Sequence, residues 1–157
     1  MRVAYFDLET TGFPRTSEIL QIAVETDESE ENDDTLFNQY IFPETSYIPH
    51  GAQKVHGISI VNGELHKNGE RLTDVTSATE GLNDFLEFLE DLRENDDEEI
   101  VLCAHNCKRF DSKTLSHNLG IRGLSLPANV KFSDSLSILK KYHQERGNGF
   151  NRFLLKS

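Results

Sequence analysis

Two carboxylates near the start of the chain have the residue types and the spacing of half a metal site. Asp7 and Glu9 are separated by one residue in a β-prone segment, so both side chains should point to the same face of a strand. Paired carboxylates repel each other, and a divalent cation removes that repulsion. Hard cations such as Mg²⁺ and Mn²⁺ prefer oxygen ligands. The pair alone also fits an ordinary solvated strand, so the inference of a metal site depends on the neighbouring residues.

Hydroxyl groups and a glycine directly follow these carboxylates. Thr10, Thr11 and Gly12 end the segment. A glycine lets a ligand approach the backbone closely, while hydroxyls and amides can hold a phosphate or the end of a sugar-phosphate chain. The segment is therefore a candidate for holding such a ligand beside the two carboxylates.

A third carboxylate follows a second strand, about a hundred residues later. The unbroken apolar run 100–104 predicts a strand buried on both faces, and a polar segment leads from it to Asp111 at the start of a helix. Ligand sites gather at the ends of strands in α/β sheets. Asp111 is therefore expected to join Asp7 and Glu9 across adjacent strands.

The elements that must position these groups alternate in type along the chain. Patterning predicts strands at 2–6, 19–24, 36–42, 99–104 and 130–133, and helices at 50–57, 78–92, 108–118 and 135–143. Ser77 and Glu80 form a capping box for the second helix, whereas 62–75 is polar and ambiguous. The order predicts an α/β fold with a mixed sheet, in which an antiparallel three-strand meander is followed by parallel strands and flanked by helices.

Length and charge limit the class of protein. The 157 residues fit one domain, the net charge is −11, and there is no apolar run of membrane-spanning length. We therefore expect a cytoplasmic or nuclear protein. The charge argues against a phosphate-coating protein. It is uneven, however: residues 1–100 carry 24 acidic and 6 basic side chains, and 101–157 carry 3 and 10. Much of the acid lies in the predicted surface tracts 25–34 and 87–99.

Four motifs in order resemble one nuclease family. FDLETTG at 6–12 and AHNCKRFD at 104–111 resemble the first two motifs of the DEDD (DnaQ-like, DEDDh subtype) 3′–5′ exonucleases, which have a ribonuclease H-like fold. The VHGI stretch at 55–58 and the FSDSL stretch at 132–136 also resemble the family's pattern. The resemblance runs from residue 3 to about residue 140.

This resemblance implies a metal-dependent exonuclease that acts on single-stranded 3′ ends. Two Mg²⁺ or Mn²⁺ ions would assist phosphodiester hydrolysis. Asp7 would bridge the ions, Glu9 would bind one and Asp111 would serve the other. The 3′ end would be held by Thr10, Thr11 and the Gly12 backbone, and Asn106 would orient Asp111 or the backbone. Whether the substrate is DNA or RNA is left open.

The third family motif, His-x₄-Asp or Tyr-x₃-Asp, has no counterpart in this sequence. His143 is followed at the required spacing by Asn148, and Tyr142 by Arg146. The resemblance therefore implies a single domain over 1–157 that lacks the C-terminal third-motif helix. Without a general base, which contributes about 10²–10⁴-fold, activity would be reduced or lost.

Two other interpretations are open at this stage. The chain could be a non-catalytic nucleic-acid-binding or protein-interaction module that reuses the exonuclease fold. A zinc site at Cys103, His105 and Cys107 is weaker, because their spacing matches no standard zinc motif.

Overall fold

The computed structural model describes residues 1–14, 16–28, 31, 36–104 and 109–133. Its main sheet has six strands in the order β7-β3-β2-β1-β8-β9. The sheet is built from β1 (Arg2–Thr10), β2 (Ile19–Glu25), β3 (Phe37–Ile41), β7 (Val75–Thr76), β8 (Ile100–Ala104) and β9 (Val130–Ser133). The first three strands form the predicted antiparallel meander. β8 pairs in parallel with β1, and β9 pairs in parallel with β8. The mixed α/β prediction is confirmed.

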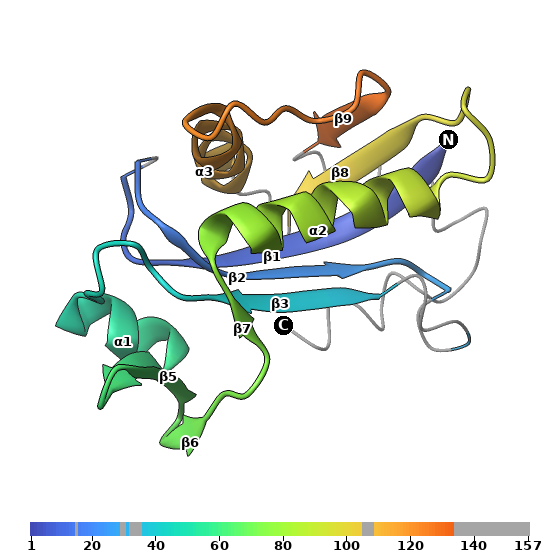
Figure 1. Ribbon diagram of the computed structural model, residues 1–157. Helices are drawn as coiled ribbons and strands as arrows, with labels where there is room; N and C mark the ends of the chain where they lie inside the picture. Colours follow the sequence, from blue (N-terminus) through green and yellow to red (C-terminus); the bar gives the residue numbers. More distant parts are fainter. Residues whose placement is uncertain (15, 29–30, 32–35, 105–108, 134–157) are drawn as a thin grey trace.

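Two helices pack against one face of this sheet, and their apolar stripes form the main core. α2 (Ala78–Leu92) and α3 (Arg109–Gly120) share a buried cluster with one side of β1. Figure 1 shows α2 lying over the sheet, roughly along the strands β1 to β3. Leu82, Phe85 and Leu89 of α2 are at most 1% exposed. The prediction of Ser77 as the N-cap of α2 is confirmed, because its hydroxyl accepts a hydrogen bond from the Glu80 amide.

The opposite face of the sheet carries a smaller buried cluster. Val3 and Tyr5 of β1 pack there with Val101 and Cys103 of β8. β8 is buried along its whole length, as its continuous apolar sequence predicts for a strand with both faces covered. The helix predicted at 135–143 lies outside the described residues.

A second, three-stranded sheet occupies the region that sequence patterning left ambiguous. It consists of β4 (Ile58–Val61), β5 (Glu64–Lys67) and β6 (Glu70–Arg71), joined as antiparallel hairpins. Each hairpin turns through an Asn-Gly pair with positive φ at both residues, at 62–63 and at 68–69. Asn-Gly pairs are the preferred sequence of such turns, so the sequence did carry a signal for this small sheet.

The short helix α1 (His50–His56) stands beside that small sheet at one end of the molecule (Figure 1). It ends at Gly57, whose φ of 73° is left-handed, as predicted for a glycine cap. None of the residues of α1 is buried. The position of α1 therefore depends on partly buried contacts and on polar contacts at its ends.

Candidate functional site

The carboxylates of β1 lie where the strand leaves its parallel partner. β1 pairs with β8 only as far as Phe6, which is opposite Ala104. Phe6 and Leu8 belong to the main core, whereas Tyr5 belongs to the opposite cluster. Because side chains alternate along a strand, Asp7 and Glu9 project from the Tyr5 side, opposite to Phe6 and Leu8. The pairing of β1 with β2 then shifts register between Glu9 and Thr10, and such irregularities re-aim side chains at strand ends.

The predicted ligand-binding segment is held by its own hydroxyl groups. Thr10 Oγ1 donates to the Gly12 carbonyl at 2.7 Å, and Thr11 Oγ1 accepts from the Glu18 amide at 3.0 Å. A Cβ atom at Gly12 would lie 3.3 Å from Ser17 Oγ, so the turn is tight at this point. These contacts shape the turn, and the Thr11 hydroxyl proton is still available to a ligand.

Asp111 lies in the first turn of α3, where it is 3% exposed. The same helix is fastened to the turn after β1 by Asn118, whose amide donates to the Ser17 carbonyl and to the Thr114 carbonyl, each at 2.9 Å. Sequence reasoning did not single out Asn118. Its buried amide connects α3 to a segment 101 residues earlier, and so it places Asp111 near the end of β1.

One cavity of about 760 Å³ brings the end of β1, the following turn, α1 and the start of α3 together. Glu9 and Asp111 both line it, with Thr10, Thr11 and Gly12. The remaining lining residues are mostly apolar: Leu8, Phe13, Pro14, Ser17, Pro49, Gly51, Ala52, Val55, His56 and Phe110. At its rim, Phe13 is 85% and Val55 is 76% exposed. Five of the seven predicted site residues thus share one cavity.

Of the other two predicted residues, only Asp7 belongs to the part of the chain that the structure describes. Asp7 is not among the lining residues, although Leu8 and Glu9 directly after it are. Asn106 lies outside the described residues, as do His105 and Cys107 of the zinc alternative, whose remaining member Cys103 is buried in β8. Within the described residues, no group of three or more His, Cys, Asp or Glu side chains could hold a metal ion.

His56 makes a connection across the cavity that the sequence did not reveal. Its Nε2 lies 3.0 Å from the Thr10 carbonyl oxygen, and its Nδ1 accepts from the Ile58 amide at 3.1 Å. Burial lowers the pKa of His56 and the charge of Lys67 acts in the same direction, while the Thr10 carbonyl opposes them. His56 is therefore held as a neutral imidazole between α1 and β1.

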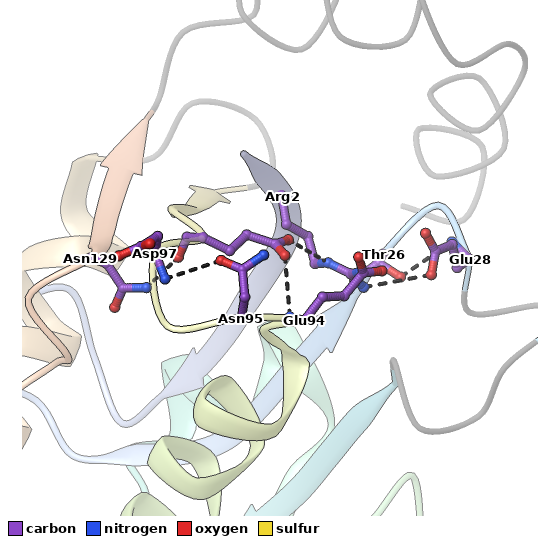
Figure 2. Close-up of polar contacts among 8 residues, drawn as sticks. Arg2, Thr26, Glu28, Glu94, Asn95, Asp97 and Asn129 are labelled. Carbon is purple, nitrogen blue, oxygen red and sulfur yellow. Dashed lines mark hydrogen bonds and ion pairs between the residues drawn. The ribbon is translucent and has the colours of Figure 1, made fainter.

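The opposite end of β1 holds much of the negative charge. Arg2 pairs with Glu94 at 2.7 Å, with Glu98 at 3.0 Å and with Glu28 at 3.5 Å (Figure 2). Burial opposes ionisation of Glu98, but the hydrogen bond and charge of Arg2 prevail and lower its pKa. β1 spans about 26 Å at about 3.3 Å per residue, so these acids lie more than a screening length from the cavity.

The mixed sheet, the helices on one face and the carboxylates at the end of β1 define a ribonuclease H-like domain. Residues 1–143 match the model of the Exuperantia RNase H-like domain, and the chain belongs to this family. No curated protein matches the chain. Membership indicates a nuclease-like or nucleic-acid-binding role. It supports the ribonuclease H-like part of the sequence resemblance and does not single out the DEDDh exonucleases. In the described residues, no helix has the length and apolar character of a membrane span.

Proposed function

We propose that this chain binds the 3′ end of a single-stranded nucleic acid in the cavity between β1, α1 and α3. One observation carries the proposal: the Thr10–Gly12 turn, two carboxylates and an exposed aromatic ring open onto the same space. A neutral 3′-hydroxyl can donate a hydrogen bond to Glu9 or Asp111, whereas a 3′-phosphate would be repelled by them. The ribonuclease H-like family supports a nucleic-acid ligand in general.

The rim of the cavity supplies a surface for bases. Phe13 and Val55 are large apolar side chains that remain mostly exposed, and both line the cavity. Stacking of a base on an aromatic ring contributes about 1–3 kcal/mol and is tolerant of sequence. A single strand that enters with its terminal base against Phe13 would need no basic groove, which suits a chain of net charge −11.

Fluorescence anisotropy with a short labelled single strand tests this assignment. We expect DNA or RNA with a free 3′-hydroxyl to bind, and a 3′-phosphorylated strand to bind more weakly in EDTA. Phe13→Ala should weaken binding at least about fivefold, which corresponds to loss of one stacked base. Tyr47→Ala is the matched control, because Tyr47 is also exposed, at 65%, but does not line the cavity. Equal affinities for the wild type and Phe13→Ala would contradict the proposal.

The second candidate function is metal-dependent 3′–5′ exonuclease activity. It is favoured by the position of Glu9 and Asp111, since carboxylates line the cavity in which the 3′ end would lie. Carboxylate oxygens are suitable donors for Mg²⁺ or Mn²⁺. The described residues nevertheless gather no group of three such ligands, and Asp7 does not line the cavity. The part of the chain that the structure describes therefore fits a two-ion centre incompletely.

A 5′-labelled single strand incubated with Mn²⁺ separates the two candidates. An exonuclease would shorten the strand from its 3′ end, and Asp7→Asn would abolish shortening. Asp74→Asn is a suitable control, because Asp74 is exposed and distant in sequence from every predicted ligand. Calorimetric titration with Mn²⁺ adds a readout that does not need turnover. The chain is a non-catalytic binding domain if it binds the strand without shortening it and if Asp7→Asn does not change the binding of Mn²⁺.

A further inference from the structure

The position of α1, which forms one wall of the cavity, depends on few contacts. α1 has seven residues, none of them buried, and its N-terminal cap makes no side-chain hydrogen bond. Ala52 packs partly against the small core under the β4–β6 sheet, and Gln53 donates to the Ile48 carbonyl at 2.8 Å. These contacts hold α1 against the β4–β6 sheet and the segment that precedes α1. They do not connect it to β1, which forms the facing part of the cavity.

His56 supplies that connection, and its hydrogen-bond partners fix its tautomer. A backbone N–H can donate only to an unprotonated ring nitrogen, so the bond from the Ile58 amide leaves Nδ1 without a proton. The proton of the neutral ring therefore lies on Nε2, which donates to the Thr10 carbonyl. The same ring thus accepts from the start of β4 and donates to the end of β1, 46 residues earlier.

The acceptor of this bond belongs to the predicted ligand-binding turn. The Thr10 carbonyl follows the register shift at Glu9, and the Thr10 hydroxyl bonds to the Gly12 carbonyl. Fixing the Thr10 peptide therefore fixes the backbone that faces the ligand. We infer that His56 is a positioning residue, which joins α1 to the Thr10–Gly12 turn and so sets the width of the cavity and the orientation of that turn.

The tautomer can be tested in the unmodified protein, independently of any ligand. Nitrogen chemical shifts of the His56 ring, measured by NMR at a pH where the ring is neutral, should show protonated Nε2 and unprotonated Nδ1. Protonated Nδ1, or a mixture of both tautomers, would overturn the inference. This measurement needs no variant, so it remains decisive even if substitution of His56 impairs folding.

Amide hydrogen exchange in variants tests whether His56 holds α1 in place. His56→Ala should accelerate exchange at the Gly57 amide, which closes α1 on the Gln53 carbonyl. His56→Gln should restore slow exchange, because its amide nitrogen can replace Nε2 as the donor to Thr10, and His56→Asn is too short to do so. His50→Ala, at the exposed first residue of α1, is the control. Unchanged exchange in His56→Ala would contradict the positioning role.

The effect on ligand binding rests on the proposed function and is measured separately. His56→Ala should weaken binding of the labelled single strand about fivefold to tenfold, as expected for the loss of one ordering hydrogen bond. His56→Gln should recover most of that affinity. If the wild type binds no strand, the proposed function fails while the tautomer and exchange results still decide the role of His56. If the strand binds equally to wild type and His56→Ala, the positioning role is refuted.

Discussion

At the scale of single residues, the site depends on a backbone acceptor as much as on carboxylates. The sequence identified Glu9 and Asp111, and both line the cavity. It could not identify the role of His56, because the partner of its Nε2 is the Thr10 carbonyl, and every residue carries a carbonyl. Asp7 shows the opposite problem. Its chemistry was evident from the sequence, but it does not line the cavity, and the spacing of Asp7 and Glu9 does not determine which of the two does.

The half-buried imidazole of His56 predicts a pH dependence of stability. The pKa of His56 is lowered in the folded chain, so the unfolded chain takes up this proton first as pH falls. Stability from the neutral ring is complete above the unfolded pKa of about 6.5 and is lost as pH falls through the lower folded value. We expect the free energy of unfolding from urea titrations to fall between pH 7.5 and pH 5.5 more in the wild type than in His56→Gln. Parallel decreases would contradict this.

At the scale of elements, hydrophobic periodicity predicted most of the fold, and turn chemistry accounts for what it missed. α2 has an apolar pattern that matches burial on one face, and β8 has the continuous pattern of a strand buried on both. The β4–β6 sheet is too short and too polar to show a period, and its Asn-Gly turns were the informative signal. α1 was predicted from its glycine cap, although it buries no side chain.

The contact between α2 and β3 predicts an unusual effect of a glycine substitution. Gly81 lies inside α2, where alanine normally stabilises a helix by about 1 kcal/mol. Here a Cβ atom would lie 2.9 Å from Ile41 Cγ1 and 2.8 Å from Thr76 Oγ1. Because Ile41 is buried, relief requires movement of the core, which costs about 1–3 kcal/mol. Gly81→Ala should therefore lower the free energy of unfolding, whereas exposed Glu87→Ala on the same helix should change it little. A stabilised Gly81→Ala would show that the packing is looser.

At the scale of the whole molecule, the two ends of β1 differ in what surrounds them. The acidic amino end is joined through Arg2 to the loops after β2 and α2, and the carboxyl end opens into the cavity. The net charge of −11 consequently says little about the site. Although Glu9 and Asp111 add negative charge locally, the acids near Arg2 are far enough away to be screened at physiological salt.

Arg2 provides a test of this arrangement, because it is the cation against which Glu98 is packed. The two side chains are each 12% exposed and 3.0 Å apart, so Arg2→Met leaves a mostly buried carboxylate with the Glu94 amide as donor but without its cation, and should destabilise the fold by about 1–3 kcal/mol. Arg71→Met removes only the exposed bridge to Glu64, and should cost less than about 0.5 kcal/mol.

The pKa of Glu98 is lowered in the folded chain. The contribution of the pair is therefore complete above the unfolded pKa of about 4.3 and declines as pH falls through the folded value. Urea denaturation should show a large difference between wild type and Arg2→Met at pH 7 that shrinks in acid, while strand binding at the distant cavity stays within about twofold. A difference that persists in acid would mean that Arg2 stabilises the fold through packing of its aliphatic stem.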